Sequence, residues 1–144
     1  MNQILTEPEL MAVGRQLAER LPPGAILWLE GDLGAGKTTL ARAIVAARGG
    51  DQGATSPTFT LAHRYFTPGG LVFHVDCYRF RDEEEASALD WEELTGGSLL
   101  IVEWPARGGA WVPPATHQVR LAHLDDLDRR IVEVVPDPAG WLDG

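Results

Sequence analysis

The chain has a single cysteine and a single lysine among its 144 residues. One cysteine, Cys77, excludes an internal disulfide and any zinc site built from several cysteines. We therefore expect Cys77 to be a small residue of the core, buried or half-buried. Every basic side chain except Lys37 is an arginine, so the position of the only lysine is informative.

Long apolar runs are also missing. No stretch approaches the length that a membrane-spanning helix needs. The N-terminal residues 1–5 lack the basic region and the apolar core of a signal peptide. We expect a cytoplasmic protein with no membrane partner.

Basic residues are fewer than acidic ones. The chain has 12 basic and 21 acidic residues, which give a formal net charge of −9. Affinity for nucleic acids comes mainly from basic side chains that neutralise phosphates. Strong direct binding of nucleic acid is therefore not expected. If the chain serves RNA chemistry, we expect a protein partner to hold the RNA.

The composition that is present is typical of a globular protein, with 44% hydrophobic and 23% charged residues. A chain of 144 residues forms one sizeable core, but it is too short for a nucleotide-binding domain and a separate substrate domain. We expect one domain over residues 1–144, with a loose tail at 136–144.

Residues 31–38, GDLGAGKT, match the phosphate-loop pattern G-x-x-x-x-G-K-[ST] at every fixed position. Glycines let backbone N–H groups approach phosphate oxygens closely. The Lys37 ammonium suits the β- and γ-phosphates, and the Thr38 hydroxyl suits Mg²⁺. The pattern predicts a site for ATP and Mg²⁺, and a phosphate loop explains why the one lysine stands at this position.

The flanking residues agree with this interpretation. Residues 25–29 are a short apolar run typical of a buried parallel strand, and residues 39–47 favour a helix that stops at Gly49. Residues 117–123 and 130–135 alternate in polarity and predict an antiparallel hairpin. We expect an α/β fold, a single P-loop NTPase domain whose mixed, mostly parallel sheet is flanked by helices, with the C-terminal hairpin extending one edge.

Two carboxylates end predicted strands. Glu103 closes the apolar run 99–102, which has the form of a Walker B strand, whose acid holds Mg²⁺ or orients the attacking water. Asp76 closes the run 71–75 and suits a metal or an activated water, or else an ion pair with Arg79 or Arg81. His74 alone is more typical of a satisfied core histidine than of a catalytic one.

Other segments have local interpretations. Thr6 and Glu9 match a capping box before a helix over 7–20. Residues 58–65 favour a strand that pairs with 71–76, and residues 81–95 favour one helix with an acidic first turn. Residues 106–109 are expected to form a loop, because Pro105 ends the strand before them. Ser56, Thr58 and Thr60 suit either a segment that senses the γ-phosphate or a strand entry rich in hydroxyl groups, and spacing does not separate the two.

Four segments together resemble a known family, TsaE (formerly YjeE), the ATPase component of the bacterial machinery that makes threonylcarbamoyladenosine in tRNA. These segments are GDLGAGKTT at 31–39, SPTFTL at 56–61, HVDCYRF at 74–80 and VEWP at 102–105. The phosphate loop is shared by a large superfamily, whereas the other three segments in this order make the match specific. At position 77 the family usually has an apolar residue such as leucine.

The resemblance implies slow ATP hydrolysis by the chain alone and partners of the TsaD and TsaB type, which form the tRNA threonylcarbamoyl transferase complex. It implies metal ligation by Thr38 and Glu103, catalytic roles for Lys37, Asp76 and Glu103, and a switch segment with Ser56, Thr58 and Thr60. The implied nucleotide-binding residues, with Glu7 near the adenine, are Glu7, Leu33, Gly34, Ala35, Gly36, Lys37, Thr38 and Thr39.

Two alternatives remain open from the sequence. A small-molecule kinase of the same fold needs an acceptor pocket and a basic lid, but Arg79, Arg81 and Arg107 do not form a lid-like cluster in the sequence. A nucleotide-dependent switch uses ATP binding to order a docking segment, with incidental hydrolysis. The sequence also lacks an obvious arginine finger, which favours slow turnover stimulated by a partner.

Overall fold

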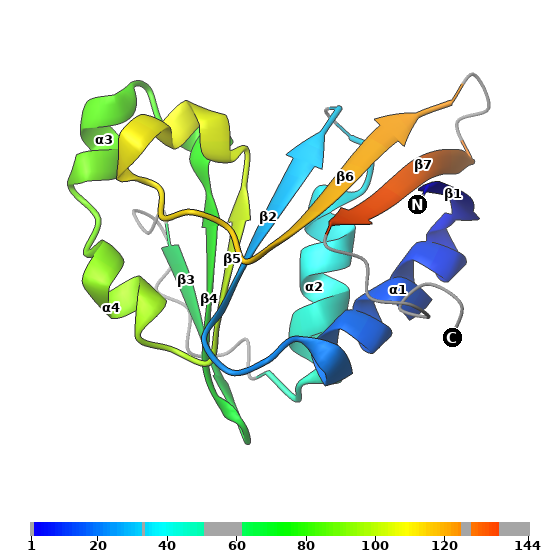
Figure 1. Cartoon of the computed structure of the whole chain (residues 1–144), viewed down its shortest axis with the longest axis horizontal. Coiled ribbons are helices and arrows are strands. Elements are labelled where there is room, and N and C mark those ends of the chain that lie inside the picture. The colour runs from blue at the N-terminus through cyan, green and yellow to red at the C-terminus, as the bar shows by residue number, and fades with distance from the viewer. Residues whose placement is uncertain (1, 33, 51–61, 125–127, 136–144) are drawn as a thin grey trace.

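A computed structural model of the chain describes residues 2–32, 34–50, 62–124 and 128–135. All of its strands belong to one seven-stranded sheet with the order β1-β7-β6-β2-β5-β4-β3 (Figure 1). The strands are β1 (Asn2–Thr6), β2 (Ala25–Gly31), β3 (Ala62–Thr67), β4 (Gly70–Asp76), β5 (Leu99–Glu103), β6 (His117–His123) and β7 (Arg129–Val135). The helices are α1 (Glu7–Arg20), α2 (Lys37–Ala47), α3 (Glu83–Ser87) and α4 (Trp91–Thr95).

The centre of the sheet is parallel and its flanks are antiparallel. β2 lies between β5 and β6 and is parallel to both, and β4 is parallel to β5. All five residues of β5 are buried, as expected for a parallel strand covered on both faces. The carboxyl ends of the central strands therefore meet at one edge of the sheet. The α/β class with a mixed sheet and a mostly parallel core is confirmed.

The two faces of the sheet carry separate cores. Alternate residues of β5 point to opposite faces, so Ile101 joins the core under α1 and α2 while Val102 joins the other core. Leu10, Leu17, Leu40 and Ile44 are the main helical residues of the first core. The short helices α3 and α4 lie on the opposite face (Figure 1), where Cys77 is fully buried, as expected. Burial raises the pKa of the Cys77 thiol to about 12.

The capping box predicted before α1 is confirmed. The Thr6 hydroxyl accepts a bond from the Glu9 amide, and the Glu9 carboxylate accepts a bond of 2.9 Å from the Thr6 amide. We expect Thr6→Ala to lower the free energy of unfolding by about 1 kcal/mol, because it leaves a first-turn amide without its cap. Urea unfolding measures this, and Thr6→Ser is the control that keeps the cap. Equal stability of Thr6→Ala and the parent chain would contradict it.

The structure corrects three predictions about the fold. The predicted single helix over 81–95 is two helices, because Asp90 accepts a bond from the Glu93 amide and so caps a new helix. The predicted loop at 106–109 belongs to a 3₁₀ helix, Pro105–Trp111. The C-terminal hairpin does not form the edge, since β1 pairs with the outer side of β7. β1 itself was not predicted, because its five residues are too few for alternation to stand out.

The remaining elements agree with the sequence in type. α1, α2 and β5 have the predicted positions, and β3 pairs with β4 as an antiparallel hairpin. Residues 58–61 of the predicted strand and the tail 136–144 lie outside the described residues. None of the helices in the described ranges has both the length and the apolar character needed to cross a membrane.

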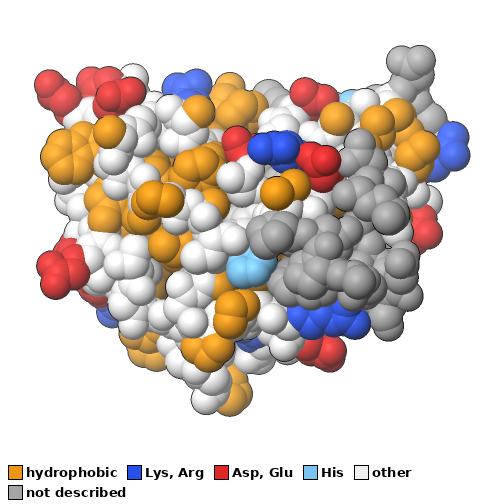
Figure 2. Space-filling view, in the orientation of Figure 1, with side chains coloured by type: hydrophobic (Ala, Val, Ile, Leu, Met, Phe, Trp, Pro, Cys, Tyr) orange, Lys and Arg blue, Asp and Glu red, His pale blue; other side chains and the backbone are white. Residues whose placement is uncertain are grey.

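Charged side chains are dispersed over one face of the molecule, among the described residues (Figure 2). On the face shown in Figure 2, basic side chains lie in separate small groups, with acidic ones between them. Several form exposed ion pairs, such as Arg64 with Glu93 and Arg120 with Glu133. The described part of this face therefore offers no continuous basic stripe for a nucleic-acid backbone.

Candidate functional site

The described glycines of the loop between β2 and α2 have the backbone that the phosphate-loop pattern predicts. Gly31 and Gly36 have φ angles of 137° and 113°, in the region that favours glycine. An added Cβ would lie 1.8 Å from the Leu121 carbonyl oxygen at Gly31 and 2.7 Å from the Leu10 side chain at Gly36. Both glycines are therefore required by close neighbours from β6 and α1, which hold the loop in place.

α2 begins at Lys37 and has Gly36 as its N-cap, so no side chain caps it among the described residues. The amides of its first turn point toward the loop, where the positive end of the helix dipole attracts anions. His123 at the end of β6 donates its amide to the Asp32 carboxylate at 3.0 Å. The C-terminal hairpin thus also supports the phosphate loop.

Lys37 is buried at the floor of the loop, with 4% of its surface exposed. Its ammonium donates to the carbonyl oxygens of Gly31 at 2.8 Å and Asp32 at 2.6 Å. Its Nζ also lies 4.4 Å from the centroid of the Trp104 ring. Burial lowers the pKa of Lys37, and the carboxylates of Glu103, Asp32 and Asp76 oppose that effect. The ammonium is thus held between carbonyl oxygens and an aromatic face.

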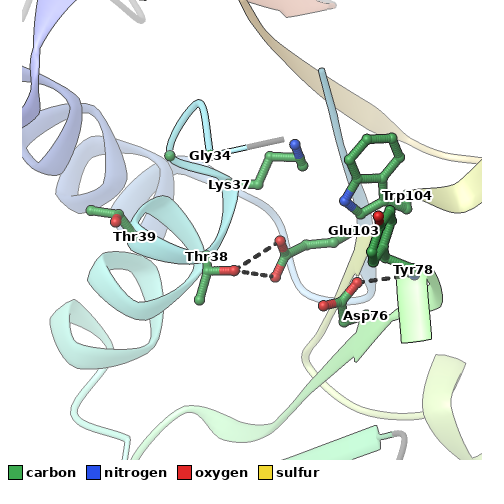
Figure 3. Close-up of a pocket in the computed structure, with 9 residues that line it drawn as sticks. Gly34, Lys37, Thr38, Thr39, Asp76, Tyr78, Glu103 and Trp104 are labelled. Carbon is green, nitrogen blue, oxygen red and sulfur yellow. Dashed lines mark hydrogen bonds between the residues drawn. The ribbon is translucent and has the colours of Figure 1, made fainter. Parts of the chain in front are cut away.

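Thr38 and Glu103 meet although 65 residues separate them in sequence. The Thr38 hydroxyl lies 3.0 Å and 3.2 Å from the two Glu103 carboxylate oxygens (Figure 3). Glu103 is 2% exposed. Its burial opposes ionisation, but hydrogen bonds from His74 and Thr38 and the charge of Lys37 outweigh burial and lower its pKa. The site therefore keeps a carboxylate beside the hydroxyl, as a Mg²⁺ site needs.

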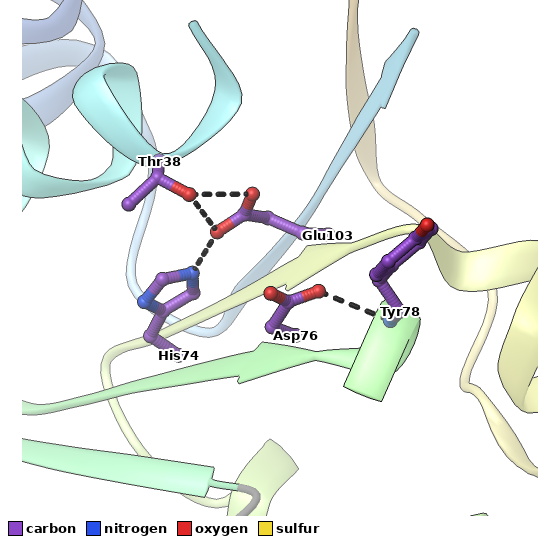
Figure 4. Close-up of polar contacts among 5 residues, drawn as sticks. All are labelled: Thr38, His74, Asp76, Tyr78 and Glu103. Carbon is purple, nitrogen blue, oxygen red and sulfur yellow. Dashed lines mark hydrogen bonds and ion pairs between the residues drawn. The ribbon is translucent and has the colours of Figure 1, made fainter. Parts of the chain in front are cut away.

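His74 is a residue of the site that the sequence did not identify as functional. Its Nε2 lies 2.6 Å from a Glu103 carboxylate oxygen, and both side chains are buried (Figure 4). As expected, it is a buried histidine with a hydrogen-bond partner, but that partner is Glu103, the predicted metal ligand. The available signal was its place two residues before Asp76, on the same face of β4.

Asp76 is the direct neighbour of Glu103 in the β4–β5 pairing. Its carboxylate accepts a bond of 3.0 Å from the Tyr78 amide. Burial and the charge of Glu103 raise the pKa of Asp76. The alternative of an ion pair is not observed, since no such contact joins Asp76 to Arg79 or Arg81, and Arg81 pairs with Glu85 instead. Asp76 is therefore a half-buried acid that faces the site.

These residues surround a cavity of about 200 Å³. Tyr78 and Trp104, which the sequence did not identify as site residues, form one side of it, with ring centroids 5.0 Å apart. Trp104 has a φ of 54°, the one positive φ of a non-glycine residue in the described ranges. The residues that line the cavity are Gly34, Gly36, Lys37, Thr38, Thr39, Asp76, Tyr78, Glu103 and Trp104.

Other predicted site residues have varied positions. Ala35 is buried within the loop. Glu7 is exposed in the first turn of α1, one turn before Leu10, which packs against Gly36, so its predicted place near the adenine stays a prediction. Leu33, Ser56, Thr58 and Thr60 lie outside the described residues.

The donor set fits Mg²⁺ with a nucleoside triphosphate. Within the described ranges, no cluster of three or more His, Cys, Asp or Glu side chains forms a metal cage. Mg²⁺ in phosphate-transfer sites uses one or two carboxylates, a hydroxyl and phosphate oxygens rather than a protein cage. Thr38, Glu103 and Asp76 supply such oxygens at the mouth of an anion-binding loop.

The fold and the geometry of the site together define a protein of the phosphate-loop class, in which Glu103 ends the strand beside β2. The chain belongs to the TsaE family, since the model of the threonylcarbamoyl adenosine biosynthesis protein TsaE matches residues 4–131. The recognition made from the sequence is confirmed.

Comparisons with individual relatives agree with this family assignment. The chain is 35% identical over 130 residues to the tRNA threonylcarbamoyladenosine biosynthesis protein TsaE of Rickettsia typhi, covering 90% of each chain. It is 32% identical over 135 residues to the protein of the same name from Haemophilus influenzae, covering 90% of this chain and 84% of the relative. The crystal structure of Bacillus subtilis YdiB superposes with a TM-score of 0.71 at 27% identity, covering 93% of this chain and 84% of the other.

Proposed function

We propose that this chain is a Mg²⁺-dependent ATPase that acts in the threonylcarbamoyladenosine modification of tRNA. The proposal rests on one observation above all: Lys37, Thr38 and Glu103 line one cavity at the mouth of the phosphate loop. Membership of the TsaE family supplies the pathway. The relatives named above carry that pathway in their names.

The chemistry supported by the site is transfer of the γ-phosphoryl group to water. ATP supplies that group, and Mg²⁺ supplies charge neutralisation at the phosphate oxygens. The chain itself contributes placement, since the loop amides and Lys37 fix the phosphates while Thr38 and Glu103 fix the metal position. His74 holds Glu103 through a bond of 2.6 Å. Little covalent chemistry is required of the protein.

Asp76 is the candidate for orienting the attacking water. It lies beside Glu103, on the far side of that residue from β2, and it lines the cavity (Figure 3). Burial and the neighbouring charge of Glu103 raise its pKa. A carboxylate with a raised pKa is a better proton acceptor than an exposed one.

Partners of the TsaD and TsaB type complete the proposal. The chain has a net charge of −9, so a partner that holds the tRNA agrees with its electrostatics. None of the described residues that line the nucleotide cavity is an arginine, which agrees with slow turnover in the absence of a partner.

The test is ATP turnover measured with and without the two partner proteins. We expect slow release of phosphate by the chain alone and a rate at least about tenfold higher with the partners, since an added catalytic arginine gives 10³-fold or more in related systems. Phosphate release without any phosphorylated small molecule distinguishes an ATPase from a kinase. Equal rates with and without the partners would contradict the proposal of stimulation.

A further inference from the structure

A second cavity, of about 210 Å³, borders the nucleotide cavity. The two share Thr38, Asp76 and Glu103, whereas Gly34 and Lys37 line only the first. The remaining lining residues of the second cavity are Arg42, His63, Tyr65, His74 and Arg79. The shared residues are those to which the proposed function gives the metal and the attacking water.

The fold explains why these side chains converge. Arg42 follows Thr38 by four residues on α2, so the two lie on one face of the helix. His63 pairs with His74 across the β3–β4 hairpin, and their ring centroids are 6.2 Å apart. His63 and Tyr65 alternate with Arg64, whose side chain lies on the opposite face and pairs with Glu93. One face of the hairpin and one face of α2 thus enclose the cavity.

The outer wall of this cavity is cationic. Arg42 and Arg79 are exposed, and neither guanidinium makes a hydrogen bond or ion pair with another described residue. Burial lowers the pKa of His63, and the nearby charges of His74, Arg79 and Arg42 lower it further. The carboxylates of Asp76 and Glu103 lie on the shared wall. The electrostatic potential in the cavity therefore becomes more positive with distance from Asp76 and Glu103, toward Arg42 and Arg79.

We propose that this second cavity is an oxyanion site that receives the inorganic phosphate cleaved from ATP and through which that phosphate leaves. The inference rests on the proposed ATPase function. After hydrolysis, ADP still occupies the phosphate loop. The cleaved phosphate therefore leaves past Thr38 and Glu103 into the second cavity, which Arg42 and Arg79 line. That space exceeds the volume of several water molecules at about 30 Å³ each, which accommodates a phosphate ion.

The test is calorimetric titration of inorganic phosphate into the full chain that has been saturated with Mg-ADP. We expect the parent chain to bind phosphate, and Arg42→Ala and Arg79→Ala each to weaken that binding about tenfold, as expected for the loss of one charge-assisted bond. Both side chains are exposed, so neither substitution removes core packing. Arg64→Ala is the matched control, because it removes an arginine from the opposite face of β3.

Titration of Mg-ADP comes first, because it tests the proposed ATPase function separately from the proposed phosphate site. Absence of Mg-ADP binding would overturn the proposed function and this inference with it. Normal Mg-ADP binding without phosphate binding, or phosphate binding that is the same in all three arginine variants and the parent, would overturn the inference alone. As a second readout, phosphate should inhibit ATP turnover of the parent and of Arg64→Ala at concentrations about tenfold lower than it inhibits Arg42→Ala.

Discussion

Replacing Lys37 by alanine is expected to weaken binding of Mg-ATP at least about 100-fold and to abolish hydrolysis. An ammonium that bonds to phosphate oxygens in a buried site contributes about 1.5–3 kcal/mol per charge-assisted bond, and about 1.4 kcal/mol corresponds to a factor of ten in affinity. Lys37 is the only lysine of the chain and has 4% of its surface exposed. No other amine lines the described part of the nucleotide cavity to replace it.

Calorimetry with Mg-ATP and Mg-ADP measures this effect. Lys37→Arg is the informative control, because it keeps the charge but replaces a compact ammonium by a broad planar group. We expect Lys37→Arg also to bind poorly, since the ammonium fits between two carbonyl oxygens and the Trp104 ring. Thermal unfolding without nucleotide shows that each variant is folded. Affinity for Mg-ATP within twofold of the parent in a folded Lys37→Ala variant would refute the assignment of the loop.

Replacing Glu103 by glutamine is expected to reduce ATP turnover by roughly 100-fold or more while nucleotide binding persists. Metal-based charge stabilisation contributes several kcal/mol to such reactions, and about 1.4 kcal/mol is a factor of ten in rate. Glutamine keeps the shape of Glu103 and most of its packing within a fully buried strand. It removes the negative charge that the proposed Mg²⁺ site uses next to Thr38.

The measurements are phosphate release and calorimetry on the same preparations, with Glu93→Gln on the exposed surface of α4 as the control. Turnover of Glu103→Gln at the parent rate would show that Glu103 is not the metal ligand. Modification of tRNA in cells separates the two remaining functions. If modification continues in a Glu103→Ala variant that binds ATP without hydrolysing it, the nucleotide-dependent switch replaces the ATPase as the working function.

The phosphate loop and the Walker B-type strand were predictable because their signals are local. Residues 31–38 specify their own backbone through glycines, and the run 99–102 ends in Glu103, the only carboxylate of that strand. Thr38 and Glu103 were predicted to share a metal, and the structure places them 3.0 Å apart. That proximity follows from topology, since β2 and β5 are parallel neighbours and end at the same edge.

The features that the sequence did not predict depend on pairing between distant segments. His74 becomes a site residue only because β4 lies beside β5, which aligns Asp76 with Glu103 and sets His74 two residues before that point. The position of β1 likewise depends on its pairing with β7, a distant segment, and not on the residues of β1 alone. The break between α3 and α4 is a different case, because the Asp90 cap that begins α4 is a local signal in the sequence.

The order of strands also governs how the molecule is made. β2, which carries the phosphate loop, has β5 and β6 as its neighbours, and both are synthesised long after it. β1 pairs with β7, so β1 has no partner strand in the sheet until β7 has been synthesised. Such non-local pairing makes folding slow and leaves apolar strands uncovered during synthesis. A chain released before β6 is synthesised would therefore lack Leu121 and His123, which contact the phosphate loop at Gly31 and Asp32.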